Sequence, residues 1–266
     1  MNPGSRFRWL PKLTGLLVLF VAAAALAADV QVMISAGFYQ AFSELAPAFE
    51  QQSGHRVSTI RGPSLGDSPE AIPNRLKRGE RADVVIMAGA SIDDLSRQGL
   101  VETGSKVDLA RSQIGMVVRA GAAKPDISSV DAFRRALLDA KSIAYSDSAS
   151  GIYLSTTLFE KLGVKDQVAG KSRKVRGPPS GELVAAVVAR GEAEIGFQQV
   201  PELIHEAGVT FVGTIPAELQ QDTFFSAALA NAAKQPEAAQ ALIRFLASAQ
   251  AAPVIAKAGL APLSVR

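Results

Sequence analysis

Residues 141–153, K-S-I-A-Y-S-D-S-A-S-G-I-Y, contain the pattern that decides the fold: a short apolar strand, then hydroxyls and a glycine, then a helix start. Ser148 and Ser150 are residue types that favour helix N-caps, and the free backbone N–H groups of a helix start bind anions. One such turn is weak support for a binding site, because Ser and Gly also occur there for capping alone. Anion binding and plain capping are therefore both open.

Two further stretches repeat this strand-to-helix pattern. Val30–Ile34 leads into Ser35-Ala36-Gly37 and a helix, and Val57–Ile60 leads into Arg61-Gly62-Pro63-Ser64 and another helix. Several turns of this kind, aimed at one point, would form an anion-binding cleft.

Strands and helices alternate along the whole chain. Apolar runs predict strands at 30–34, 56–60, within 78–87, and at 113–119, 193–197, 209–212 and 223–229. Helical periodicity predicts helices at 38–51, 70–78, 91–98, 128–138, from 148 to about 162, before Gly191, and at 236–249. Such alternation is typical of α/β proteins with parallel sheets, and the Gly/Ala/Lys/Pro segment 120–126 is expected to cross between two lobes.

The first 27 residues have the pattern of a secretory signal peptide. Arg6, Arg8 and Lys12 form a basic start, residues 13–26 are apolar, and Ala25-Leu26-Ala27 is a small-residue cleavage site. The apolar run is shorter than the roughly 20 residues of a membrane span, although an uncleaved anchor is the alternative. We expect cleavage near Ala27 and an exported mature chain.

Without this segment the protein is neutral. The full chain has 28 basic and 25 acidic residues, and its net charge of +3 lies in the three basic residues of the signal. A neutral chain without basic and aromatic runs does not suggest nucleic-acid binding. Having no cysteine excludes disulfides and thiolate chemistry, and two histidines, His55 and His205, are too few for a histidine metal site. No phosphate-binding loop or dinucleotide motif is present, so we expect no metal and no cofactor.

Several stretches resemble the periplasmic molybdate-binding proteins and their relatives among bacterial solute-binding proteins. The best matches are A-F-E-Q-Q-S-G at 48–54, A-D-V-V-I at 82–86, L-S-R-Q-G-L at 95–100 and G-E-A-E-I-G-F at 191–197. The resemblance covers essentially the whole mature chain. It implies a two-lobed α/β fold, each lobe a mostly parallel sheet flanked by helices, with residues 28–116 plus 222–266 in lobe I and 117–221 in lobe II.

The same resemblance implies a periplasmic protein that closes around a small anionic ligand and has an inner-membrane transporter as a possible partner. In this family the pocket uses neutral donors, namely hydroxyls and backbone N–H groups at strand-to-helix turns. The positions that match those turns are Ser35 with Ala36, Gly62 to Ser64, and Ser150 with Gly151.

Three departures from the molybdate-binding pattern favour a carboxylate ligand over molybdate. Gly37-Phe38-Tyr39 replaces a serine-containing helix start, Phe197-Gln198-Gln199 stands where a tyrosine motif is expected, and Arg61 ends a strand before a Gly-Pro turn. The planar guanidinium suits a carboxylate. The alternative is an exposed Arg61 paired with Asp67 or Glu70. With Gln198 and Gln199 as donors, the sequence predicts a di- or tricarboxylate ligand.

An enzyme on the same fold is the alternative function. Aconitate isomerases resemble molybdate-binding proteins, and they interconvert trans- and cis-aconitate by an allylic proton shift. Without cysteine or site histidines, the base would be a carboxylate, a tyrosine or a lysine. Each candidate also has a structural interpretation, as a helix-start acid or as packing. The candidates are Asp67, Tyr153 and Glu182, with Asp147 and Tyr39 beside them.

Overall fold

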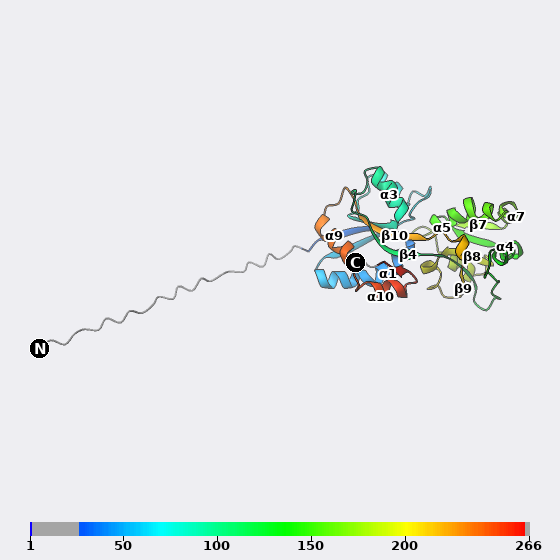
Figure 1. The fold of residues 1–266 in the computed structure, drawn as a ribbon. Coiled ribbons are helices and arrows are strands. Elements are labelled where there is room, and N and C mark those ends of the chain that lie inside the picture. Colours follow the sequence, from blue (N-terminus) through cyan, green and yellow to red (C-terminus); the bar gives the residue numbers. More distant parts are fainter. Residues whose placement is uncertain (2–26, 264–266) are drawn as a thin grey trace.

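A computed structural model of the chain describes Met1 and residues 27–263. Two lobes lie side by side along the molecule (Figure 1). The predicted signal peptide, apart from its two end residues, lies outside the described residues. Within the described residues, no helix is both long and apolar enough to cross a membrane.

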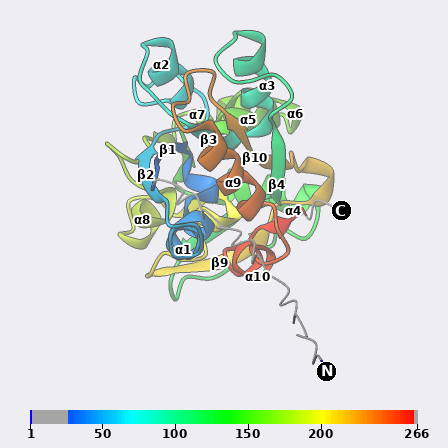
Figure 2. The same cartoon turned by 90° about the vertical axis from the view of Figure 1, so that its left-hand side faces the viewer.

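Lobe I is built on a six-stranded sheet with the strand order β11-β4-β10-β3-β1-β2. Its strands are β1 (Asp29–Ile34), β2 (Arg56–Arg61), β3 (Val84–Ala88), β4 (Val107–Ser112), β10 (Thr223–Leu229) and β11 (Ala261–Pro262). One face is covered by α1 (Ala36–Ser53), α9 (Pro236–Leu246) and α10 (Ala252–Lys257). The other face is covered by α2 (Ile72–Lys77) and α3 (Gly89–Arg97), which Figure 2 shows above the sheet, with α1 and α10 below it.

Lobe II is built on a five-stranded sheet with the strand order β7-β6-β8-β5-β9. Its strands are β5 (Ile114–Arg119), β6 (Ile143–Ser146), β7 (Ser172–Val175), β8 (Ile195–Gln199) and β9 (Val209–Thr214). One face packs against α4 (Val130–Asp139), the continuous helical stretch α5 (Ala149–Tyr153), η1 (Leu154–Leu158) and α6 (Phe159–Lys161), and α7 (Lys165–Ala169). The other face packs against α8 (Val184–Ala189). Two short turns, η2 (Val200–Glu202) and η3 (Ala217–Leu219), follow β8 and β9.

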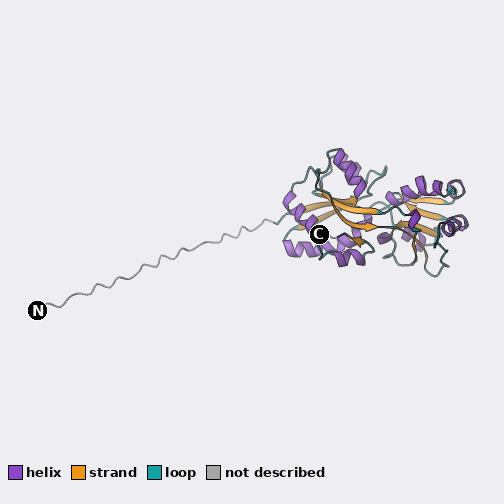
Figure 3. Ribbon diagram, viewed as in Figure 1, coloured by secondary structure: helices purple, strands orange, loops and turns teal. Residues whose placement is uncertain are grey.

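Neighbouring residues of the central strands pack on opposite faces of their sheets. In β1, Val32 and Ile34 contact the α1 side, whereas Met33 belongs to the cluster with α2 and α3. In β5, Val117 packs with α8, on the face opposite to α4. Helices cover both faces of the sheets (Figure 3). The central strands are therefore mostly apolar in sequence, and in β1 only Gln31 interrupts the run from Val30 to Ile34.

The predicted α/β fold of two helix-flanked lobes is confirmed, but the sheets are mixed rather than mostly parallel. The triplets β2-β1-β3 and β7-β6-β8 are parallel. The strands β10 and β5 pair antiparallel with both of their neighbours. β5 enters the sheet of lobe II from lobe I, and β10 enters the sheet of lobe I from lobe II. Each therefore runs opposite to the neighbouring strands of the sheet that it joins.

The prediction that 120–126 crosses between the lobes is wrong. β5, which precedes it, already belongs to the sheet of lobe II, and Ala120 N donates to Gly208 O at 2.8 Å. The chain crosses at Gln113, between β4 and β5, and returns between β9 and β10. Gln220 of the return segment bonds to both backbone groups of Ile114, at 2.8 and 3.0 Å, and so ties the crossings together.

The lobe boundaries proposed from the sequence, 28–116 plus 222–266 and 117–221, stay a prediction. The first change of sheet lies at residue 113, three residues before the predicted boundary.

Candidate functional site

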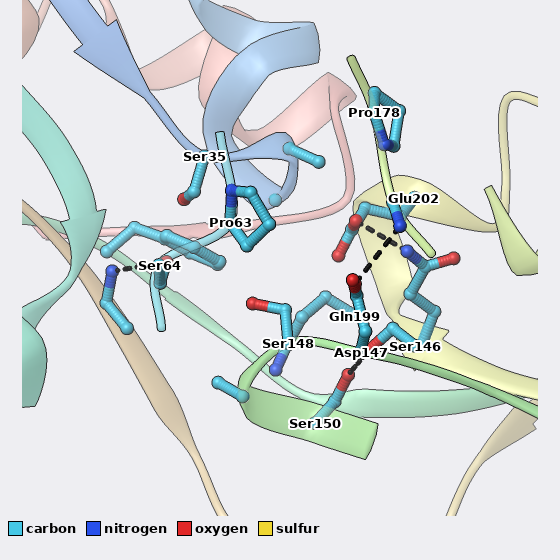
Figure 4. Close-up of a pocket in the computed structure, with 17 residues that line it drawn as sticks. Ser35, Pro63, Ser64, Ser146, Asp147, Ser148, Ser150, Pro178, Gln199 and Glu202 are labelled. Atoms are coloured by element: carbon cyan, nitrogen blue, oxygen red, sulfur yellow. Dashed lines mark hydrogen bonds between the residues drawn. The ribbon is translucent and has the colours of Figure 1, made fainter. Parts of the chain in front are cut away.

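A cavity lies between the lobes, at the carboxyl ends of β1, β2, β6 and β8 (Figure 4). Ligands of open α/β sheets bind in this position, outside the carboxyl ends of the strands. The cavity is open to solvent, and the space among its lining atoms, open solvent included, is about 460 Å³. Its lining consists of Ser35, Ala36, Gly37, Pro63, Ser64, Ala88 and Phe225 from lobe I, and Ser146, Asp147, Ser148, Ala149, Ser150, Gly177, Pro178, Gln198, Gln199 and Glu202 from lobe II.

Ser35 and Ser148 occupy the N-cap positions of α1 and α5, the helices that begin at the cavity. Neither side chain bonds to a backbone N–H of its own helix. Ser35 is buried, and among the described residues its Oγ has no hydrogen-bond partner. The first N–H groups of a helix also lack an intrahelical acceptor. The capping interpretation therefore does not account for these two hydroxyls, and the site can donate several hydrogen bonds to an anion.

The other three serines of the lining connect parts of the site. Ser64 Oγ accepts from Ala88 N at 3.1 Å, which ties the turn after β2 to the end of β3. Ser150 Oγ lies 3.1 Å from Ser146 Oγ. Gly151 does not line the cavity, and a Cβ there would lie 1.7 Å from Ser146 O. Gly151 thus allows α5 to start directly against β6.

Arg61 lies beside the cavity and not in its lining. Its Cζ is 4.1 Å from the ring centroid of Tyr39, and its Nε is buried without a partner among the described residues. Within residues 27–263 Arg61 forms no ion pair with Asp67 or Glu70, since Glu70 contacts Arg176 instead. The predicted alternative of a surface ion pair is therefore not formed. Gly62 also lies outside the lining.

A carboxyl group that the sequence analysis missed lines the cavity. Glu202 lies in η2, directly after β8, and Gln198 Nε2 donates to its Oε1 at 2.7 Å. Gln198 Oε1 accepts from Val184 N at 2.9 Å, so the amide that holds Glu202 is itself held at its other end. Gln199 Nε2 donates to Thr223 Oγ1 at 2.9 Å. The signal for Glu202 in the sequence is an acid close after a buried strand, in Q-Q-V-P-E at 198–202.

Burial raises the pKa of the Glu202 carboxyl to about 8. The hydrogen bond from Gln198 and the positive charge of Arg61 oppose this rise, and the negative charge of Asp147 adds to it. Arg61 is therefore within electrostatic reach of the cavity. A carboxyl group with a pKa near the working pH can both take up and return a proton.

The bases proposed from the sequence lie in different places. Asp147 lines the cavity and accepts from Gly177 N at 3.1 Å. Tyr153 donates to Leu219 O at 2.9 Å, and burial raises its pKa. Glu182 pairs with Arg190, whose hydrogen bonds lower the pKa of that carboxyl. The cavity lining includes none of Tyr153, Glu182, Asp67 and Tyr39.

Known proteins resemble this chain along nearly its whole length. The sequence profile of the bacterial extracellular solute-binding proteins matches residues 30–261. The chain is 47% identical to an aconitate isomerase of a Pseudomonas species over 232 residues, 87% of each protein. It is 27% identical to a molybdate-binding protein of Azotobacter vinelandii over 239 residues, 88% of this chain and 90% of that protein.

The fold resembles solved structures of the same kind. The structure of the Azotobacter vinelandii periplasmic molybdate-binding protein matches with a TM-score of 0.69 at 22% identity, over 87% of this chain and 98% of that one. The resemblance predicted from the sequence is confirmed by these matches. The chain belongs to the bacterial extracellular solute-binding protein family.

Proposed function

We propose that this protein is an exported aconitate isomerase, which interconverts trans- and cis-aconitate in the cavity between its lobes. The observation that carries the proposal is Glu202, a carboxyl group with a pKa of about 8 on the wall of an anion-binding cavity. Protonated Glu202 can donate a hydrogen bond to an anion, whereas ionised Glu202 repels it, so only proton transfer uses both forms of this group. The identity of 47% to an aconitate isomerase supports the same activity.

The chemistry requires one group that takes a proton and gives it back. Ionised Glu202 removes a proton from the methylene carbon next to a substrate carboxylate, and the electron pair of that C–H bond becomes a new double bond. The old double bond opens and takes the proton at its far carbon. One C–H bond breaks and one forms, so that a single carboxyl group serves first as base and then as acid.

The intermediate of this shift spreads negative charge over the substrate carboxylates, and the site offers donors for it. The hydroxyls of Ser35 and Ser148 and the first N–H groups of α1 and α5 lie at the cavity. Preorganised donors of this kind stabilise developing charge better than water does. Gln198 fixes the position of the Glu202 carboxyl.

Solute binding without turnover is the second candidate function. The family match and the molybdate-binding relative support it. In this case the protein carries a di- or tricarboxylate in the periplasm to an inner-membrane transporter, and protonated Glu202 donates a hydrogen bond to the ligand. The predicted signal peptide supports export in both cases.

Proton NMR of millimolar trans-aconitate in deuterated buffer, with a trace of the mature protein, tests the proposal. We expect cis-aconitate signals to appear and deuterium to enter the methylene position. Both should happen faster than in a sample without protein. An unchanged spectrum, together with a melting temperature that rises with carboxylates, would show a carboxylate receptor. A melting temperature that rises only with molybdate would contradict the carboxylate site in either function.

A further inference from the structure

Two turns at the cavity share a sequence pattern, one in each lobe. R-G-P-S at 61–64 begins at the last residue of β2, and R-G-P-P-S at 176–180 begins directly after β7. Both strands are edge strands of their sheets, and each lies parallel to the strand that leads into an N-cap serine, β1 or β6. Both turns contribute lining residues, Pro63 and Ser64 from one and Gly177 and Pro178 from the other.

In lobe I the strand register places Arg61 beside the start of α1. Arg61 pairs with Ile34, the residue directly before the N-cap Ser35. The guanidinium lies over Tyr39 of the same helix, with its Nε unpartnered among the described residues.

In lobe II the register places Arg176 in the equivalent position. Val175 pairs with Ser146, and the same register continued by one residue sets Arg176 opposite Asp147. Asp147 directly precedes Ser148, the N-cap of α5. Each lobe therefore holds one arginine at the same place relative to a helix that begins at the cavity.

The charge of the cavity requires cations from outside its lining. Among the described residues that line it, Asp147 and Glu202 are acidic and none is Lys or Arg. A tricarboxylate brings up to three negative charges, and burial of unpaired charges is strongly unfavourable. Arg61 and Arg176 each directly precede a turn that lines the cavity, so they are placed to supply the missing positive charge.

The turn of lobe II already holds a carboxylate from the opposite lobe. Glu70 accepts a hydrogen bond from Ser180 Oγ, and its Oε2 lies 3.8 Å from the Arg176 guanidinium. Arg176 also donates to Ser68 Oγ at 3.4 Å. The Arg176 side chain is 52% exposed, so it has room to turn toward a ligand.

We propose that Arg61 and Arg176 form a carboxylate clamp with one arm in each lobe. Each arm binds one carboxylate of a di- or tricarboxylate ligand, and Glu70 occupies the Arg176 arm while no ligand is bound. This inference rests on the carboxylate ligand of the proposed function. The planar guanidinium fork fits the two oxygens of a carboxylate, so the clamp selects carboxylates over tetrahedral oxyanions.

Calorimetry with tricarballylate, a saturated tricarboxylate that has no double bond to shift, tests the clamp on the mature protein. We expect Arg176→Gln and Arg61→Gln each to weaken tricarballylate binding by about 10-fold or more, because each variant loses a charge-assisted hydrogen bond to the ligand. The matched control is Arg173→Gln, because Arg173 lies on β7, just before Arg176, and its side chain is similarly exposed at 51% but pairs with Glu192 at 2.9 Å. We expect the control to bind like the wild type.

If Arg176→Gln binds tricarballylate as tightly as the control does, the clamp proposal is refuted. Arg61 is partly buried over Tyr39, so Arg61→Lys is the second variant at that position. Lysine keeps the positive charge but lacks the planar guanidinium fork. If Arg61→Lys binds tricarballylate with wild-type affinity, this result also contradicts the clamp. If the wild type isomerises trans-aconitate while the arginine variants bind normally, only the clamp fails. If the wild type neither isomerises nor binds any carboxylate, the proposed function fails as well.

Discussion

The substitution Glu202→Gln separates the proposed catalytic role of this carboxyl from its effect on stability. Glutamine keeps the size of the side chain and can still accept the hydrogen bond that Gln198 Nε2 donates at 2.7 Å. It cannot take a proton from the substrate. General acid–base groups contribute about 10²- to 10⁴-fold to a rate, so we expect kcat for aconitate isomerisation to fall by at least about 100-fold.

The same substitution is expected to stabilise the protein at alkaline pH. The pKa of Glu202 is raised from 4.5 to about 8. Between these values the unfolded chain is ionised while the folded carboxyl keeps its proton, so the free energy of unfolding decreases as the pH rises. At 1.36 kcal/mol per pH unit, the decrease reaches at most about 5 kcal/mol above pH 8. Glu202→Gln removes this decrease.

The assay combines the isomerisation rate by NMR with the melting temperature at about pH 4 and about pH 9, which lie below and above the two pKa values of Glu202. We expect the variant to lose activity, to match the wild type in stability at the lower pH and to exceed it at the higher pH. Glu206→Gln is the control, because Glu206 lies four residues further on and does not line the cavity. Full activity in Glu202→Gln would refute the assignment of the base, and equal stability at both pH values would refute the raised pKa.

Three further substitutions test other parts of the site. Ser35→Ala removes a buried hydroxyl that has no partner among the described residues, so we expect an unchanged melting temperature and about 5- to 10-fold weaker tricarballylate binding by calorimetry. Unchanged affinity would exclude Ser35 from the site. Glu70→Gln frees the Arg176 arm, and we expect binding to tighten a few-fold, whereas weaker binding would mean that Glu70 holds the lobes together. Gly151→Ala places a Cβ 1.7 Å from Ser146 O, so we expect a melting temperature lower by several degrees, measured by circular dichroism. An unchanged melting temperature would contradict the close approach of α5 and β6.

Much of the fold was predictable because the central strands are buried on both faces. β3 and β5 are nearly continuous apolar runs, and β1 is interrupted only by Gln31 between Val30 and Ile34. Such runs between helices identify an α/β protein without any contact information. β4 and β7 were missed, since each mixes buried with exposed polar residues and so lacks a clear period. Segment 120–126 was misassigned because Gly, Ala and Pro favour surface loops as much as crossings between lobes.

The candidate site was predictable where local chain chemistry specifies it. Ser35, Ser64, Ser148 and Ser150 were proposed from strand-to-helix turns, and all four line one cavity. Arg61 was proposed from its place at the end of a strand, and it lies beside that cavity, over Tyr39. Glu202 and Arg176 were missed, although Arg176 begins an R-G-P turn as Arg61 does. The neighbouring residues do not indicate which segments of the other lobe either side chain meets.

The sequence by itself determined the α/β class, the family resemblance and the helix starts that offer donors to an anion. These features depend on apolar periodicity and on turn residues, which act over a few neighbouring positions. Only the tertiary structure decided which turns share a cavity, where the chain crosses between lobes, and which carboxyl has the pKa of a base. A raised pKa requires burial, and at Glu202 burial outweighs the hydrogen bond from Gln198 and the positive charge of Arg61, which lower the pKa. The folding of both lobes brings these groups together.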